Sequence, residues 1–90
     1  MLRLEAYISG VVQGVGFRYF ARKMAKESGV TGFVMNLNDG RVFLVAEGSG
    51  EQLEKFISTI RQGPVHGIVK KVETAQREAT GEFTNFNIRY

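Results

Sequence analysis

The sequence contains no cysteine and only one proline, and it has no long apolar run. Without cysteine the protein has no disulfide, no thiol nucleophile, no iron–sulfur cluster and no zinc–thiolate site. A single proline excludes a long proline-rich linker. The longest purely apolar run, residues 42–46, is far shorter than the ~20 residues that a membrane-spanning helix needs.

The N-terminal segment gives no sign of export. Arg3 and Glu5 interrupt it, so no apolar stretch there resembles a signal peptide. Together with the missing membrane-length run, this predicts a cytoplasmic protein that does not bind a membrane.

The length and charge narrow the class of protein further. A chain of 90 residues fits one domain, which we expect to span residues 1–90, and is too short for a TIM barrel or a kinase. Hydrophobic residues make up 43% and charged residues 23%, as in globular proteins. The net charge of +3 suits an anionic ligand but does not distinguish nucleic acid from phosphate.

Alternating apolar residues, or a run of β-branched and aromatic ones, predict five strands, of which the segment 66–77 has the weakest pattern. Apolar residues with a helical period predict two helices. In chain order we predict a strand over 2–11, a helix over 17–28, strands over 30–37 and 42–46, a helix over 50–62, and strands over 66–77 and 86–90.

Local signals support several of these boundaries. Gly29 is a typical helix terminator, and Ser49 with Gln52 forms a capping box before the second helix. Glu51 and Lys55 have the spacing of an ion pair on that helix. The sequence Asn38-Asp39-Gly40 predicts a hairpin turn, because these residues tolerate positive φ values.

This order of elements predicts an α+β fold. Two βαβ units with right-handed crossovers place both helices on one face of an antiparallel sheet, which is the ferredoxin-like α/β sandwich with one additional C-terminal strand. The strand 42–46 is apolar on both faces and should be central, whereas the charged strand 66–77 should lie at an edge. The helix faces predict seven core residues: Phe17, Phe20, Met24, Leu53, Phe56, Ile57 and Ile60.

The glycine-rich loop before the first helix is the strongest candidate for a binding site. It does not match the dinucleotide fingerprint, because Tyr19 stands where a third glycine is needed, nor the Walker motif, because Phe17 and Arg18 replace Lys and Ser or Thr. Its glycines still favour a nest of backbone N–H groups beside a helix N-terminus, which attracts anions. Arg18 is unfavourable at this end of a helix dipole unless a bound anion compensates for it.

The other polar candidates carry less information. Asn36 interrupts an apolar strand, although asparagine is also common close to turns. His66, the one histidine, begins a predicted edge strand far from the glycine loop, so we expect no catalytic role. Glu73, Glu78 and Glu82 are scattered without the spacing of metal ligands.

Two segments of the chain resemble the signatures of the acylphosphatase family. The first is the uninterrupted run from Gly10 to Arg18, which reads GVVQGVGFR. The second is the run from Gly32 to Asn36, followed at the family's spacings by Gly40, Val42 and Gly48. The alternating segment 86–90 is also similar to the family's closing strand. The resemblance covers essentially the whole chain, and two long signatures are far more specific than a single glycine motif.

The resemblance implies hydrolysis of acyl phosphates, the mixed anhydrides of carboxylic and phosphoric acids, to a carboxylate and inorganic phosphate. It implies that Arg18 binds the phosphate and that Asn36 holds the attacking water. The phosphate cradle is then the backbone of Gln13, Gly14, Val15, Gly16, Phe17 and Arg18. It further implies no metal, no organic cofactor and a monomer. We expect inorganic phosphate to be both the product and a competitive inhibitor.

Elementary chemistry agrees with this expectation. The carboxylate that leaves an acyl phosphate needs little protonation, so a general acid is dispensable. Phosphoryl transfer then mainly requires charge stabilisation and alignment. The guanidinium of Arg18 and the loop amides can stabilise the charge. The neutral amide side chain of Asn36 can provide the alignment by orienting water.

Two alternatives remain. RNA-recognition domains share this order of elements and stack bases on aromatic residues of the third strand, but residues 41–45 read RVFLV and lack the glycine and two of the aromatics of that motif. We therefore expect no nucleic acid as a partner. The second alternative is an acylphosphatase-like module of a larger carbamoyl-transferring enzyme.

Overall fold

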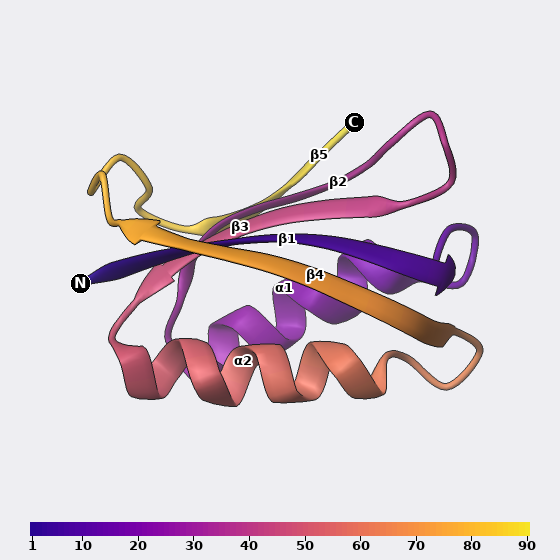
Figure 1. The fold of residues 1–90 in the computed structure, drawn as a ribbon, viewed down its shortest axis with the longest axis horizontal. Helices are drawn as coiled ribbons and strands as arrows, with labels where there is room; N and C mark the ends of the chain where they lie inside the picture. The colour runs from indigo at the N-terminus through magenta and orange to yellow at the C-terminus, as the bar shows by residue number, and fades with distance from the viewer.

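The computed structural model describes all 90 residues, Met1–Tyr90 (Figure 1). Its elements are β1 (Leu2–Val11), α1 (Phe17–Ser28), β2 (Thr31–Asn36), β3 (Val42–Gly48), α2 (Gly50–Gln62), β4 (Ile68–Glu78) and β5 (Phe86–Arg89). All seven predicted elements are present in the predicted order, and their ends differ from prediction by at most two residues.

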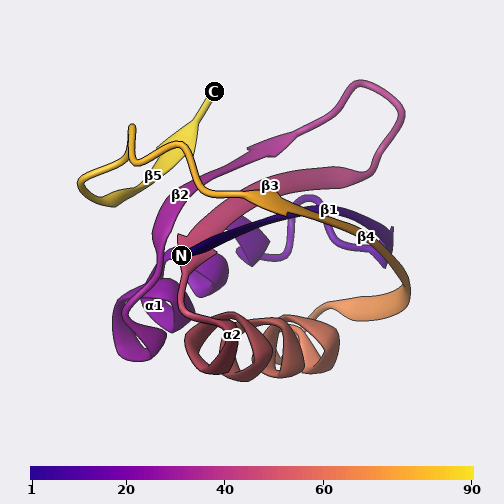
Figure 2. The same ribbon diagram turned by 60° about the vertical axis from the view of Figure 1, so that its left-hand side comes forward.

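The strands form one five-stranded sheet in the order β4-β1-β3-β2-β5. β3 is central and β4 lies at an edge, as the sequence predicted. The pairs β1–β3, β1–β4 and β2–β3 are antiparallel, whereas β5 pairs parallel to β2, so the sheet is mixed at that edge. Figure 2 shows both helices on the same face of the sheet, which confirms the ferredoxin-like architecture. Neither helix is long and apolar enough to cross a membrane.

The local signals at the ends of α2 were only partly correct. The capping box is present: Gln52 N donates to Ser49 Oγ over 3.1 Å, and Ser49 N donates to Gln52 Oε1 over 2.9 Å. Glu51 and Lys55, in contrast, form no ion pair, because the chain's ion pairs involve other residues. Both side chains are exposed, where such a pair contributes at most a few tenths of a kcal/mol.

The β2–β3 turn also differs from the expectation in one respect. Only Gly40 has a positive φ, of 93°, and no residue other than glycine does so anywhere in the chain. Leu37 O accepts a hydrogen bond from Gly40 N at 3.2 Å, and Leu37 N donates to Arg41 O at 2.8 Å, which closes a three-residue loop. Asp39 does not adopt the positive φ that was expected of it. Its carboxylate instead accepts hydrogen bonds from Arg41 N and Nε.

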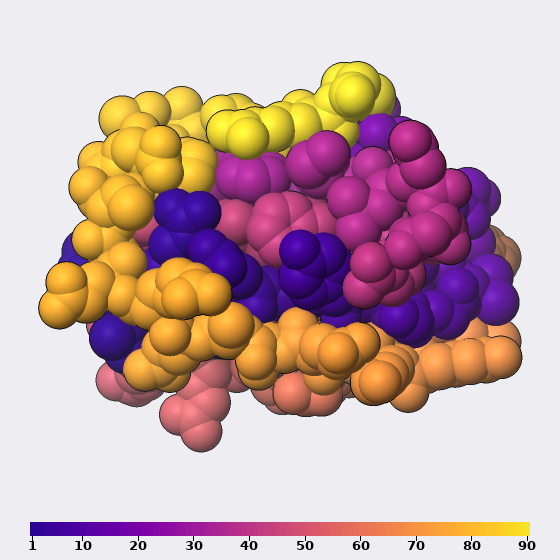
Figure 3. All heavy atoms as spheres, turned by 45° about the horizontal axis from the view of Figure 1, so that its top comes forward, coloured from indigo at the N-terminus to yellow at the C-terminus, as the bar shows by residue number.

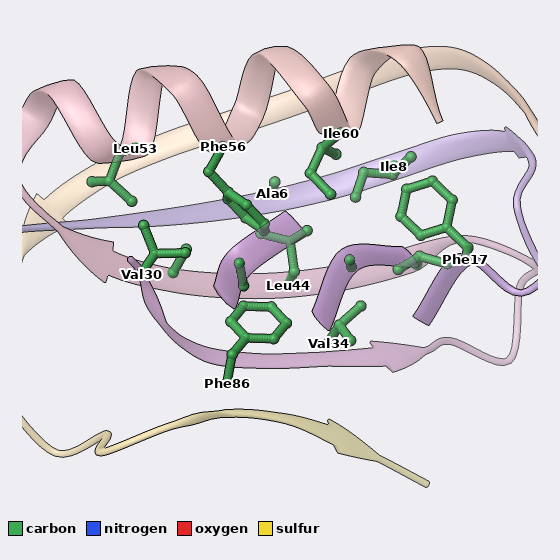
Figure 4. Close-up of a cluster of buried hydrophobic side chains, with 14 of the residues drawn as sticks. Ala6, Ile8, Phe17, Val30, Val34, Leu44, Leu53, Phe56, Ile60 and Phe86 are labelled. Atoms are coloured by element: carbon green, nitrogen blue, oxygen red, sulfur yellow. The ribbon is translucent and has the colours of Figure 1, made fainter. Parts of the chain in front are cut away.

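The hydrophobic core lies between the sheet and the two helices (Figure 4). In Figure 4, side chains of α2 point toward residues of the sheet, among them Ala6, Ile8 and Leu44. Of the seven predicted core residues, Phe17, Leu53, Phe56 and Ile60 are buried. The other three, Phe20, Met24 and Ile57, are only partly buried. They pack against the margin of the core, because each helix turns these positions toward the edge of the helical layer.

Aromatic and arginine side chains pack on one another on the face of the sheet without helices, which is turned toward the viewer in Figure 3. The ring of Tyr7 packs on that of Phe43 with centroids 4.8 Å apart, and Phe43 packs on Phe33 at 5.9 Å. The guanidinium of Arg41 lies 4.7 Å from the centre of the Tyr7 ring, and that of Arg89 lies 3.6 Å from the centre of the Phe33 ring. These cation–π contacts occupy faces of the rings that a stacking ligand would need.

A buried carboxylate holds the segment that joins β4 to β5. These strands lie at opposite edges of the sheet, so the segment must cross the sheet's end, and Glu47 of central β3 lies under the crossing. Glu47 is 3% exposed, and its carboxylate accepts hydrogen bonds from Thr80 N at 2.8 Å, Thr80 Oγ1 at 3.1 Å and Gly81 N at 3.0 Å. Burial alone would raise the pKa of Glu47, but these hydrogen bonds together with Arg3 outweigh it and hold the pKa below its ordinary value of 4.5.

Candidate functional site

A hollow of about 230 Å³ lies where β1 leads into α1 and β2 ends. Its walls are Val12, Gly14, Gly16, Phe17, Arg18, Tyr19 and Asn36. The structure therefore brings Arg18 and Asn36, which the sequence singled out separately, to one site. Two other hollows, one along α2 and one between α1 and β5, are larger, so size alone does not identify this site. The unpaired polar groups described below do.

The conformation of the β1–α1 loop depends on two glycines. Gly14 and Gly16 have φ values of 75° and 78°, in the left-handed region that other residues rarely adopt. A Cβ atom at either position meets nothing within 4 Å, so the backbone conformation and not a lack of space requires glycine. Gly16 is the N-cap of α1 and provides no side-chain cap.

The amide groups of this loop have no acceptor within the protein. The first donor of α1 is Phe20 N, which donates to Gly16 O at 3.0 Å, and no amide of residues 13–19 donates a hydrogen bond within the chain. The first turn of α1 also contains no acidic residue. A run of free N–H groups at the positive end of a helix dipole favours an anion.

Arg18 extends from the first turn of α1 and is partly buried. Phe17, which is 2% exposed, fixes this turn in the core. The guanidinium of Arg18 lies 4.7 Å from the centre of the Tyr90 ring, and it forms no ion pair with any carboxylate of the chain. The site therefore holds one positive charge that nothing within the protein neutralises.

Two tyrosines beside Arg18 were not predicted as site residues. The hydroxyl groups of Tyr19 and Tyr90 share a hydrogen bond of 3.3 Å. This hydrogen bond raises the pKa of Tyr90 above its ordinary value of 10.0, so its phenol is uncharged at neutral pH. Tyr90 follows β5, whose pairing with β2 brings it near Arg18. No local pattern in the sequence indicates that pairing.

Asn36, the last residue of β2, carries an unusual buried atom. Its Oδ1 has no hydrogen-bond partner, and it is the one buried side-chain nitrogen or oxygen in the protein of which this is true. An unpaired buried polar atom costs about 1–3 kcal/mol of stability. Asn36 lines the hollow together with the loop that carries the free donors, and an unpaired polar atom there indicates a place for a ligand or a water molecule.

The side chain of Gln13 has a role that the sequence did not indicate. Only its backbone was expected to contribute to the site. Its Nε2 donates hydrogen bonds to Leu37 O at 2.7 Å and to Arg41 O at 2.9 Å. Gln13 thereby ties the loop that carries Arg18 to the turn that follows Asn36.

The remaining candidates do not line the hollow. The segment of His66 nevertheless lies at the same end of the sheet as the glycine loop, contrary to the expectation, because Ile68 pairs with Val11. His66 is exposed in the segment between α2 and β4 and does not line the site. Glu73, Glu78 and Glu82 are also exposed, and Glu82 accepts a hydrogen bond from Arg3 at 3.1 Å. No group of three or more His, Cys, Asp or Glu side chains has an arrangement that could hold a metal ion.

Comparisons of the sequence and of the structure with known proteins agree on one family. The acylphosphatase family model matches residues 4–88. An acylphosphatase of Archaeoglobus fulgidus is 46% identical to the chain, with all of both chains covered. The crystal structure of acylphosphatase from Bacillus subtilis superposes with a TM-score of 0.97 at 33% identity, again with all of both chains covered. Full-length HypF in its phosphate- and nucleotide-bound form matches with a TM-score of 0.84 at 26% identity, and the chain covers 12% of it. The full-length matches to curated relatives, the family model and the fold agree, and the chain belongs to the acylphosphatase family.

Proposed function

We propose that the protein hydrolyses acyl phosphates to a carboxylate and inorganic phosphate in the hollow that holds Arg18 and Asn36. One observation carries this assignment of the site. Free anion donors and Asn36, whose side-chain oxygen has no hydrogen-bond partner, line the same small hollow. Acyl phosphate hydrolysis needs both, the donors for the phosphate and the acceptor for the water.

The phosphate group of the substrate binds to the loop amides of residues 13–18 and to the Arg18 guanidinium. The left-handed glycines hold the amides in place before the substrate arrives, so little reorganisation is needed as charge develops on the phosphate oxygens. Fixed donors of this kind contribute about 3–4 kcal/mol each to transition-state stabilisation in other enzymes. The Tyr90 ring limits the directions in which the guanidinium can turn.

Asn36 orients the attacking water. Its Oδ1 accepts a hydrogen bond from the water, which satisfies the buried oxygen and directs a lone pair of the water toward phosphorus. A neutral amide is too weak a base to remove the proton, so the proton passes to a phosphate oxygen of the substrate. The carboxylate leaves without a general acid, and none of these steps requires a metal ion or an organic cofactor.

The alternatives have less support. Nucleic-acid bases would have to stack on the open sheet face, where Arg41 and Arg89 already lie over Tyr7 and Phe33. The match to HypF is weaker than the matches that extend over whole curated relatives, which favours the acylphosphatase activity over a module of a larger enzyme.

Two further features belong to this proposal. The hollow is built by residues of a single chain, which supports a monomer as the active form. The absence of cysteine means that the fold gains nothing from an oxidising compartment, which is consistent with a cytoplasmic location. Sedimentation of the purified protein tests the first point, and localisation of the tagged protein in its host tests the second.

The test is phosphate release from benzoyl phosphate in the presence of a chelator. We expect turnover with chelator, competitive inhibition by inorganic phosphate, and weaker binding together with slower turnover in Arg18→Ala. Arg61→Ala is the matched control, because Arg61 is an exposed arginine on α2 that forms no ion pair and does not line the hollow. An Arg18→Ala enzyme with the kinetics of Arg61→Ala would show that the site is wrongly placed.

A further inference from the structure

A second and larger hollow adjoins the proposed site. It has a volume of about 690 Å³ and lies between α1 and β5, which Figure 2 shows on the same side of the molecule. Tyr19 lines both hollows, so the two hollows are neighbours at this side chain. From there it runs along α1 to Gly29. We call this hollow the α1–β5 groove.

The groove is positively charged on one side only. Its α1 wall carries three exposed cations, Arg22, Lys23 and Lys26. None of them forms an ion pair, and no Asp or Glu lines the groove. The other wall is neutral and polar, with Thr84, Asn85 and Asn87. The walls also include buried apolar residues: Ala25, Val30 and Phe86.

The cations continue the line that Arg18 begins. Arg18, Arg22 and Lys26 are spaced four residues apart, so they lie on one face of α1 with about 6 Å between successive positions along the axis. The Arg22 guanidinium lies 5.4 Å from the centre of the Tyr19 ring, which places it at the entrance of the groove. An anion held by Arg22 or Lys26 is therefore about 6–12 Å along the helix from the phosphate at Arg18.

We propose that the α1–β5 groove binds the acyl part of the substrate and selects acyl groups that carry a second negative charge. This inference rests on the proposed function and names its substrate class: acyl phosphates of dicarboxylic or otherwise anionic acids. The carbon skeleton of the acyl group lies against the exposed ring of Tyr19, and its terminal anion meets Arg22 and Lys26. A neutral acyl group gains the apolar contact alone.

Two substrates of nearly equal shape test the proposal. In 4-carboxybenzoyl phosphate the ring carries a carboxylate opposite the reacting carbonyl, and in 4-carbamoylbenzoyl phosphate it carries an uncharged amide. We expect kcat/KM to be about tenfold higher for the carboxylate, since two exposed charge contacts each contribute a few-fold. The ratio should shrink as ionic strength rises.

The double variant Arg22→Gln/Lys26→Gln should bring the ratio of the two kcat/KM values close to one. The matched control is Lys55→Gln/Arg61→Gln, which removes two exposed cations from α2 and changes the net charge by the same amount. This control should keep the ratio of the unmodified protein. Circular dichroism checks that all variants are folded.

The possible failures can be told apart. Equal kcat/KM values for the two substrates in the unmodified protein overturn the anionic groove while leaving acyl phosphate hydrolysis intact. Loss of the preference in both double variants also overturns it, because net charge and not the groove then attracts the substrate. Release of phosphate from neither substrate overturns the proposed function itself.

Discussion

The two ends of the sheet differ in whether their buried polar groups have partners within the protein. In Figure 1 the β1–α1 loop and the β2–β3 turn lie at one end, and the segment between β4 and β5 lies at the other. At the first end, Asn36 Oδ1 is buried without a partner and Arg18 has no carboxylate. At the second, the carboxylate of Glu47 is buried yet accepts hydrogen bonds from Thr80 and Gly81.

A buried group whose partners lie within the protein, such as Glu47, stabilises the fold. A buried group without partners, such as Asn36, is a candidate for binding a ligand. A buried charge without partners would cost several kcal/mol, and Glu47 avoids this cost through its hydrogen bonds and Arg3. Asn36 Oδ1 has no partner within the protein, so only a water or a ligand can satisfy it. Burial alone therefore says little about function. What matters is whether the buried group has partners.

The sharpest test of the comparison is Asn36→Ala. We expect turnover to fall by about 10²–10³-fold, while the affinity for substrate and phosphate changes little, because Asn36 contacts the water and not the phosphate. The free energy of unfolding should stay the same or rise, since the variant loses an unpaired buried oxygen. Steady-state kinetics and urea denaturation measure both. A folded variant with normal turnover would remove the water-orienting role.

At the other end, Glu47→Gln should show the reverse pattern. We expect a loss of about 1.5–3 kcal/mol in the free energy of unfolding at pH 7, because hydrogen bonds to a charged acceptor become hydrogen bonds to a neutral one. The kcat should stay close to that of the unmodified protein. A large fall in kcat without a loss of stability would contradict the structural role.

Acidification provides a second measurement on the same residue. The folded protein holds the pKa of Glu47 below 4.5, so the folded state favours the ionised carboxylate. Its contribution to stability is thus complete above pH ~4.5 and is lost as the pH falls through the lowered pKa. The stability of Glu47→Gln and that of the unmodified protein should converge in this acidic range. Parallel curves would show that the charge contributes nothing.

Gln13→Ala should have a smaller effect, on both stability and kcat. Two hydrogen bonds to Leu37 O and Arg41 O are lost, but each carbonyl keeps a backbone partner, so we expect a loss of about 1–2 kcal/mol in stability. Because Gln13 ties the loop to the turn after Asn36, kcat should fall severalfold as well. Gln62→Ala, which removes an exposed glutamine that forms no side-chain hydrogen bond, is the control.

His66→Ala should have the smallest effect. His66 is exposed and outside the hollow, so kinetics and stability should remain within experimental error. An inactive but folded His66→Ala enzyme would show that an acid–base step is missing from the proposed mechanism. The pH dependence of kcat/KM in the unmodified protein shows independently whether such an acid–base step exists.

Most of the fold could be predicted because its information is local. The alternation in residues 2–11, the helical spacing from Phe17 and the capping box at Ser49 each depend on neighbours within a few residues, and each was confirmed. The parallel pairing of β5 with β2 was not predicted, because nothing in residues 86–90 specifies a partner strand. Tyr90 was therefore not recognised as a neighbour of Arg18, and the pattern of the helices alone overstated the burial of Phe20, Met24 and Ile57.

The sequence by itself determined the local conformation of the proposed phosphate loop. Only glycine adopts the left-handed conformations at positions 14 and 16 readily, and Arg18 must follow them in the first helical turn. Only the tertiary structure decided that Asn36 lies opposite that loop, that its oxygen has no partner, and that Glu47 at the far end does. These properties depend on which strands become neighbours, and strand pairing joins residues far apart in the sequence whose contacts no local pattern records.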